Sequence, residues 1–239
     1  MKAVLAVILV VLLGLAGFGN LGSAQAEGHS VLLAEEKQRI MQATVRINFA
    51  NGEVGVNWAL GSMVLLDGKT VVVTHNHWAS SLAESSTIIL SAADHALIAT
   101  LTGKEFFASI RYQDAGTILF DAPQAMLNYV RAAHIELPAA AVGQDLAPGS
   151  LVWSVYFPGK VGEELDVRAM SVENGNAAQQ QPVYRLRSLD GRPEQPGDSG
   201  SGIWWDGKLV GNMWAIVMVA TPAGGWQDSN ESYAAVLNW

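Results

Sequence analysis

A glycine-rich hexapeptide near the C-terminus carries the residue types that nucleophilic chemistry needs. Residues 197–202 read Gly-Asp-Ser-Gly-Ser-Gly and place Ser199 between small neighbours. A serine hydroxyl is a poor nucleophile unless a base takes its proton. The glycines allow a tight turn whose amides can hold a developing oxyanion. Because Gly, Asp and Ser are also ordinary turn formers, a plain surface turn is the alternative.

Two upstream segments supply a candidate base and a candidate acid. His77 closes the segment that follows the β-branched run 71–74, and Asp114 precedes the apolar run 118–120. The order along the chain is therefore His77, Asp114, Ser199. In such a triad the histidine accepts the serine proton while the aspartate orients the imidazole and stabilises its charged form. Asp94 and Asp121 are the alternatives to Asp114.

These three motifs, in this order, resemble those of the chymotrypsin/trypsin-like serine peptidases. Residues 74–78, Thr-His-Asn-His-Trp, match the family's Thr-Ala-Ala-His-Cys at the threonine and at His77. Residues 114–119 resemble its Asp-Ile-Ala-Leu-Leu with one extra small residue. Residues 197–201 match its Gly-Asp-Ser-Gly-Gly except at Ser201, as in bacterial members. The resemblance runs from about residue 40 to the end and implies an all-β fold of two antiparallel Greek-key barrels with the active site between them.

The resemblance also assigns roles around the nucleophile. The backbone amides of Gly197 and Ser199 would form the oxyanion hole. The family's substrate-lining Ser-Trp-Gly segment corresponds to Trp214, Ala215 and Ile216, a departure that leaves the shape of the specificity pocket open.

Two further positions depart from the animal members of the family. Pro193 stands where trypsin-like members carry a specificity aspartate, so cleavage after Lys or Arg is not supported, although Glu194 is adjacent. Asp198 would pair with a newly cut Ile-Val-Gly-Gly terminus, which this chain lacks. We therefore expect Asp198 to bond nearby amides or an unidentified cation.

A metal site is the competing interpretation of the histidines. His75 and His77 lie two residues apart, so on a strand both would point to one side, and His-x-His can hold zinc with a third ligand. His29, His95 and His134 show no spacing that completes the set. We therefore expect no metal and no cofactor.

Composition bounds the compartment and the partners. The chain has 239 residues, a net charge of −8 and no cysteine. Residues 1–26 read as a signal peptide, with a basic start, an apolar run and the small-x-small site Ala24-Gln25-Ala26; an uncleaved membrane anchor is the alternative. We expect a secreted or periplasmic, bacterial protein whose core holds it together without disulfides. Its acidity argues against nucleic acid as a partner, because a negatively charged protein and phosphate backbones repel each other.

The remaining chain reads as short strands separated by turns. Two Asp-Gly-Lys turns, at residues 67–69 and 206–208, predict hairpins. Over residues 41–49 one face carries the apolar Ala43, Val45, Ile47 and Phe49 and the other the polar Thr44, Arg46 and Asn48, which predicts a half-buried strand. Helical periodicity is weak throughout. The predicted organisation is a first barrel over residues 27–130, an interdomain strap over 131–149 and a second barrel over 150–239. Further strands are predicted at 87–91, 96–101, 109–112, 117–120, 151–156 and 183–187.

The sequence as a whole predicts an exported serine endopeptidase. Ser199 would form an acyl-enzyme with a protein or peptide substrate, His77 and Asp114 would complete the triad, and no membrane would be involved unless the N-terminal segment stays uncleaved. The alternative is a catalytically inactive peptide-binding or adaptor protein on the same fold, because fold alone does not imply activity.

Overall fold

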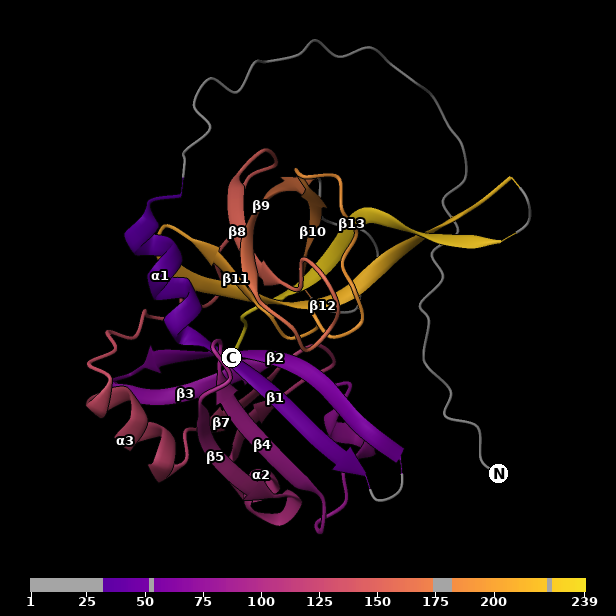
Figure 1. The fold of residues 1–239 in the computed structure, drawn as a ribbon. Helices are drawn as coiled ribbons and strands as arrows, with labels where there is room; N and C mark the ends of the chain where they lie inside the picture. The colour runs from indigo at the N-terminus through magenta and orange to yellow at the C-terminus, as the bar shows by residue number, and fades with distance from the viewer. Residues whose placement is uncertain (1–31, 52–53, 174–181, 223–224) are drawn as a thin grey trace.

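Two antiparallel β-structures make up the protein (Figure 1). The computed structural model describes residues 32–51, 54–173, 182–222 and 225–239. The predicted signal peptide and most of the polar loop before Pro182 lie outside the described residues. Within these ranges, no helix is long and apolar enough to cross a membrane.

The first half is a curled sheet of seven strands in the order β5-β4-β1-β2-β3-β7-β6. All its pairings between strands are antiparallel. Its strands are β1 (Thr44–Asn51), β2 (Val54–Leu66), β3 (Lys69–Thr74), β4 (Thr87–Ala92), β5 (Leu97–Thr102), β6 (Ile110–Gln113) and β7 (Ile118–Asp121).

The second half is a closed six-stranded barrel in the order β10-β13-β12-β11-β8-β9. The predicted all-β class with two β-barrels is thereby confirmed. The barrel strands are β8 (Leu151–Tyr156), β9 (Asp166–Glu173), β10 (Val183–Ser188), β11 (Gly202–Trp205), β12 (Lys208–Ala220) and β13 (Trp226–Val236).

Both predicted hairpins form with the backbone that their sequence demands. Asp67 and Gly68 have φ of 49° and 74°, and Asp206 and Gly207 have φ of 49° and 68°. Two successive positive φ angles are the signature of the two-residue turn that matches strand twist, and Asp-Gly favours it. The turns join β2 to β3 and β11 to β12.

The strand predicted over residues 41–49 begins at Thr44, and more of its side chains are buried than the pattern predicted. Helix α1 (Ala34–Ala43) occupies its start, and β1 follows. Val45, Ile47 and Phe49 are buried, as the alternation predicted, but so is Arg46 on the face predicted to be polar. Its guanidinium donates to the carbonyl oxygens of Ala93, Gly162 and Glu163, which belong to loops of both halves. Since these bonds satisfy the buried cation, Arg46 links the two β-structures.

Helices α2 (Gly103–Ser109) and α3 (Gln124–Ala132) were not predicted from periodicity. The start of α2 has a local signal, a capping box in which Thr102 and Glu105 exchange side-chain and backbone bonds. Strands β9 and β13 were also missed.

A shared core joins the halves. Leu60, Val71 and Val73 of the first sheet pack in one cluster with Val155 and Trp204 of the barrel. Burial of this kind fixes the two structures against each other, and the predicted site lies at their junction.

The chain segment between the halves is bonded to both. Leu65 of β2 donates to the carbonyl of Pro138 at 2.9 Å and accepts from the amide of Ala140 at 3.2 Å. Leu209 of β12 donates to the carbonyl of Ala139 at 3.1 Å and accepts from the amide of Ala141 at 2.8 Å. Residues 138–141 are therefore paired with a strand of each half.

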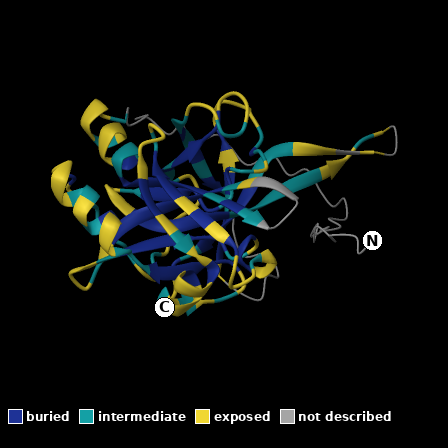
Figure 2. Cartoon of the chain, turned by 60° about the horizontal axis from the view of Figure 1, so that its bottom comes forward, coloured by how far each residue is buried: buried dark blue, intermediate teal, exposed yellow. Residues whose placement is uncertain are grey.

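Strands β12 and β13 extend beyond the barrel as a two-stranded arm, which Figure 1 shows in yellow and Figure 2 shows largely exposed or half-buried. We define the arm as residues 215–220 of β12 with residues 226–230 of β13.

Candidate functional site

The loop that carries Ser199 is bonded directly to the first sheet. The amide of Leu60 in β2 donates to the carbonyl of Ser199 at 2.9 Å. The carbonyl of Leu60 in turn accepts from Thr74 Oγ1 at 2.6 Å, at the end of β3. Half-buried Ser199 therefore lies against the strand end from which His75 and His77 continue.

Two glycines make this close approach possible. Gly200 has φ of 86°, and a Cβ there would lie 2.1 Å from the carbonyl oxygen of Leu60. Gly197 has φ of 111°, and a Cβ there would lie 2.5 Å from a methyl carbon of Val161. Neither the backbone angle nor the space suits a side chain. The geometry accounts for the glycines that frame Ser199 in the sequence.

Asp198 braces the loop from inside. It is fully buried, and its carboxylate accepts from the amide of Phe157 at 2.9 Å and from that of Gln195 at 2.8 Å. Bonds to nearby amides were one of the two roles expected for it in place of a cut N-terminus. Burial raises the pKa of Asp198, while Glu194 and these two amides act to lower it.

A buried ion pair that the sequence did not reveal lies beside Asp198. Arg168 of β9 pairs with Glu194, and the two side chains are each only 2% exposed. Arg168 also donates to the carbonyl of Arg192 at 3.1 Å and stacks over Tyr156, with its guanidinium carbon 4.6 Å from the ring centre. Burial first, and the neighbouring Asp198 second, raise the pKa of Glu194 well above its usual range. Glu194 is thus held by Arg168, and its role here is to anchor the loop.

His77 is bonded to a tryptophan of the other half. Its Nε2 accepts from the indole nitrogen of Trp214 at 2.9 Å. Partial burial of the ring lowers the pKa of His77. An accepting Nε2 means that the neutral ring carries its proton on Nδ1, the tautomer that a general base needs. The accepting lone pair itself is taken by Trp214.

His75 is a buried neutral neighbour. Its Nδ1 accepts from the amide of His77 at 3.2 Å, and burial lowers its pKa to about 3. Its ring packs close to Gly200. Within the described ranges, no third His, Cys, Asp or Glu joins His75 and His77 in a group suited to a metal ion.

The described hydrogen bond between Asp114 and the histidine segment is made by Asn76, which lies between His75 and His77. The carboxylate of Asp114 accepts from Tyr112 Oη at 2.8 Å and from the amides of Gly116 and Thr117 at 2.8 and 2.7 Å. Its carbonyl accepts from Asn76 Nδ2 at 2.5 Å. The structure shows no hydrogen bond between the described Asp114 and His77 side chains, and its role as the acid stays a prediction.

The two alternative carboxylates are engaged elsewhere. Asp121 pairs with Arg111, and Asp94 accepts from the amide of Ala96 at 3.1 Å in a turn.

A further buried residue that the sequence did not reveal is Asn212. Asn212 of β12 accepts from Thr117 Oγ1 at 2.8 Å and donates to the carbonyl of Gly116 at 3.0 Å. It thereby fixes, from the barrel, the turn whose amides hold Asp114. A buried asparagine two residues before Trp214 carries no motif that would single it out.

The segment predicted to line substrate begins the arm. Trp214, Ala215 and Ile216 are half-buried, and Ala215 and Ile216 pair with Tyr233 and Ser232 of β13.

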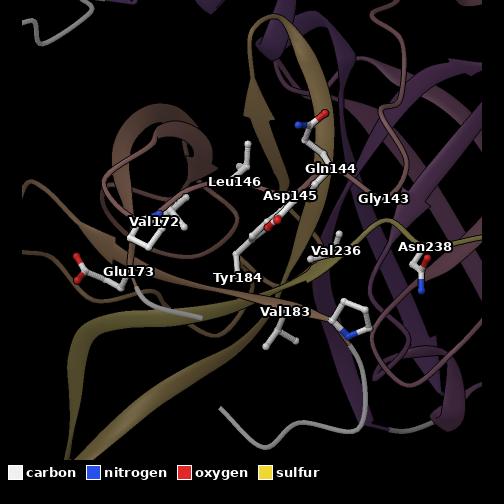
Figure 3. A pocket seen from close by; sticks show the side chains of 12 residues that line it. Gly143, Gln144, Asp145, Leu146, Val172, Glu173, Val183, Tyr184, Val236 and Asn238 are labelled. Carbon is white, nitrogen blue, oxygen red and sulfur yellow. Dashed lines mark hydrogen bonds between the residues drawn. The ribbon is translucent and has the colours of Figure 1, made fainter. Parts of the chain in front are cut away.

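The cavity in Figure 3 is built from residues outside the predicted site. It measures about 490 Å³ and lies between the strap and the second barrel, where Tyr184 and Asp145 project among its walls. Burial and the charge of Asp145 raise the pKa of Tyr184, whose hydroxyl donates to the carbonyl of Gln144. No predicted site residue lines it.

The curled sheet, the closed barrel and the Ser199 loop between them define the fold of the HtrA-type and trypsin-like serine proteases. The HtrA-type protease AlgW with a tripeptide superposes with a TM-score of 0.58 at 15% identity, over 85% of this chain and 59% of AlgW. The active form of the Rv3671c protease from M. tuberculosis gives 0.55 at 15% identity, over 94% of this chain and 89% of that one. The chain thus spans about three fifths of AlgW. No protein-family model and no curated protein sequence matches the chain.

Proposed function

We propose that the protein is an exported serine endopeptidase with Ser199 as nucleophile, His77 as general base and Asp114 as the carboxylate that orients His77 and stabilises its charged form. The observation that carries the proposal is the loop around Ser199, which glycines, a buried aspartate and a buried ion pair hold against the end of β3. Rigid support of this kind is what a reacting group needs.

In the proposed reaction Ser199 Oγ bonds to the carbonyl carbon of a peptide while His77 Nε2 takes the hydroxyl proton. The amides of Gly197 and Ser199 stabilise the oxyanion. Collapse of the tetrahedral intermediate breaks the C–N bond, and His77 returns the proton to the leaving amine. Water then repeats the sequence on the acyl-enzyme. No cofactor takes part.

The reaction requires two local changes. Because Trp214 holds the Nε2 lone pair, the indole must release His77 before Ser199 can donate to it. Asp114 must likewise turn from the amides of Gly116 and Thr117 to His77 Nδ1.

Active-site labelling with a fluorophosphonate tests the proposal. We expect Ser199 to be labelled, and Ser199→Ala to abolish labelling and lower peptide turnover by several orders of magnitude. Proteolysis that survives in Ser199→Ala, or that depends on added zinc, would overturn the triad.

A second candidate function is an inactive peptide-binding protein on the same fold. The unjoined side chains of His77 and Asp114 favour it. A folded wild-type protein that binds peptides but resists labelling would establish this function instead.

Export belongs to the same proposal. Ala24-Gln25-Ala26 predicts a mature terminus at Glu27. N-terminal sequencing of the exported protein checks it, and an intact Met1 in the membrane fraction would favour the anchor.

A further inference from the structure

Arg46 carries a buried charge that is bonded mainly to the other half of the protein. Its side chain is fully buried in β1. Its guanidinium donates to the carbonyl of Ala93 at 2.9 Å, to that of Gly162 at 3.3 Å and to that of Glu163 at 2.5 Å. Burying a cation is costly unless its N–H groups are bonded. Two of these three bonds therefore tie the loop between β8 and β9 to the first sheet.

The same guanidinium also contacts the start of this loop. We define the β8–β9 loop as residues 157–165, which follow Tyr156 and precede Asp166. The guanidinium carbon of Arg46 lies 5.4 Å from the centre of the Phe157 ring, within the range of a cation–π interaction. Arg46 thus touches the β8–β9 loop near both of its ends, from a strand of the other half.

The β8–β9 loop in turn supports the turn that carries the proposed nucleophile. The amide of Phe157 donates to the carboxylate of Asp198 at 2.9 Å, and the carbonyl of Phe157 accepts from Gln195 Nε2 at 3.2 Å. Val161 packs directly on Gly197, where a Cβ would lie 2.5 Å from a methyl carbon of Val161. The loop therefore contacts the turn at both Asp198 and Gly197.

The contact with Gly197 matters because of the role proposed for its amide. An oxyanion donor has to keep its N–H free for the reacting group, so packing and not a hydrogen bond must set its direction. Glycine has access to more backbone angles than any other residue, and Gly197 has φ of 111°. Val161 is the side chain that packs on Gly197 in this conformation.

We propose that Arg46 is a positioning residue for the oxyanion hole, which fixes the β8–β9 loop so that Val161 holds the amide of Gly197 in place; this rests on the proposed function. Preorganised donors act on the charge that develops in the transition state and little on the bound substrate. Arg46 therefore contributes to kcat and not to KM, although its buried side chain is out of reach of a substrate.

The split between kcat and KM tests the proposal. Arg46→Met fills much of the same space but donates no hydrogen bond, and it is assayed on a peptide that the wild type cleaves, found in a random library. Deleting one oxyanion donor costs about 10²–10³ in kcat, so for a displaced donor we expect a fall of about 10- to 100-fold. KM should stay within about twofold of the wild-type value, since ground-state binding is untouched.

Ile88→Ala is the control for a loss of stability alone. Ile88 is fully buried in the core of the first sheet, away from the β8–β9 loop. Its truncation should lower the urea midpoint but leave kcat unchanged in the folded enzyme. An equal fall of kcat in Ile88→Ala, or a higher KM at unchanged kcat in Arg46→Met, would overturn the positioning role.

A double-mutant cycle tests the route through Val161. Val161→Ala removes the contact with Gly197 and should lower kcat by at least about tenfold. If Arg46 acts through Val161, the variant Arg46→Met/Val161→Ala should be no slower than the slower single variant. Unchanged kcat in Val161→Ala, or losses that multiply, would contradict this route. If Arg46→Met does not fold, Arg46→Lys takes its place in the cycle, because lysine keeps the charge but loses the forked donors.

Two inhibitors separate the oxyanion from the rest of binding. With a peptide aldehyde, Ser199 Oγ bonds to the carbonyl carbon, its proton passes to His77 and the carbonyl oxygen becomes an oxyanion. The matching peptide alcohol has no carbonyl to attack. We expect Arg46→Met to weaken the aldehyde by about 10- to 100-fold and to leave the alcohol unchanged. Equal weakening of both would assign Arg46 to substrate binding.

Hydrogen exchange tests the support of the turn without catalysis. In a Ser199→Ala background, mass spectrometry follows the amide of Asp198, which donates to the carbonyl of Gln195 at 3.0 Å. We expect Arg46→Met to speed its exchange by at least about tenfold and Ile88→Ala to leave it unchanged. Unchanged exchange and unchanged kcat, in an enzyme whose Ser199 is labelled, overturn the role of Arg46 while the proposed function stands. A wild-type protein that resists labelling overturns the proposed function and the oxyanion role with it.

Discussion

The two sides of the proposed site differ in how completely they are assembled. On the nucleophile side, Asp198 and Glu194 are buried and bonded within the barrel, and the backbone of Ser199 is bonded to β2. On the base side, His77 is exposed and bonded to Trp214, and Asp114 is bonded to its own turn. If the proposed triad acts, we expect any rearrangement before catalysis to occur at His77 and Asp114, because the loop that carries Ser199 is already supported by buried bonds.

The physical reason lies in the cost of disturbing each side. Breaking a buried ion pair leaves an uncompensated charge in a dry interior. Exchanging the indole on His77 for another donor, or turning Asp114 from two amides, costs a few hydrogen bonds in partial contact with water. The base side is therefore the one that can rearrange during a reaction.

Among the substitutions considered, Asp114→Asn is expected to have the largest effect on activity. If the Asp114 carboxylate bonds to His77 during catalysis, the amide introduced by this substitution cannot stabilise the charged imidazole in its place. Turnover should then fall by about 10⁴-fold with the fold retained. The measurement is single-turnover peptide cleavage. Asp121→Asn is the control, because Asp121 already pairs with Arg111. Greater harm from the control would reassign the acid.

Arg168→Met removes the buried cation that supports the loop carrying Ser199. It leaves Glu194 and Asp198 buried without their cation, so we expect the free energy of unfolding at pH 7 to drop by about 3–5 kcal/mol, and labelling of Ser199 to slow. Urea denaturation measures it. Replacing both partners, in Arg168→Met/Glu194→Leu, should recover most of the stability; if it does not, the pair acts through something other than buried charge.

The pH dependence of stability tests whether His75 is buried as a neutral ring. Its pKa is about 3 when folded and near 6.5 when unfolded, so between these values only the unfolded chain binds the proton. Stability is fully present above pH 6.5 and falls as pH drops toward 3, by about 1.4 kcal/mol per pH unit from this residue. His75→Gln keeps an acceptor for the amide of His77 and should flatten the slope by that amount. Parallel curves for wild type and variant would contradict the burial of a neutral ring.

Trp214→Phe gives the smallest expected change. Phenylalanine keeps the ring but not the N–H, so His77 Nε2 becomes free, and its pKa should rise because the neutral form loses a donor. We expect fluorophosphonate labelling of Ser199 to accelerate by about tenfold or less. Trp205→Phe is the matched control in the barrel. Slower labelling in Trp214→Phe would show that the indole supports the reaction.

The sequence predicted the strand framework well where local chemistry decides it. The Asp-Gly turns and the alternation of Val45, Ile47 and Phe49 need only neighbours along the chain, and each appears in the structure. Helix α3 has no capping side chain and was missed. Buried Arg46 was missed because its three carbonyl partners come from loops far away in the chain.

In the candidate site, too, local features were predicted from the sequence and contacts between distant residues were not. A short motif marks Ser199, and its glycines show why. Arg168, Asn212 and the bond from Trp214 to His77 each join residues more than twenty positions apart. Single residues in ordinary strands carry no local sequence pattern that indicates such partners. The turn after Asp114, whose amides bond to its carboxylate, was also not predicted from the sequence.

The strap limits how the halves can move. Residues 138–141 are bonded along one side to Leu65 and along the other to Leu209. A hinge needs a few residues free to change their backbone angles, and these are clamped by ladder bonds on both sides. Rigid-body closure of one half over the other is thereby disfavoured. If the proposed triad forms, we therefore expect His77, Asp114 and Ser199 to come together by side-chain rotation, on the fast timescale of such rotations, without a slower domain motion.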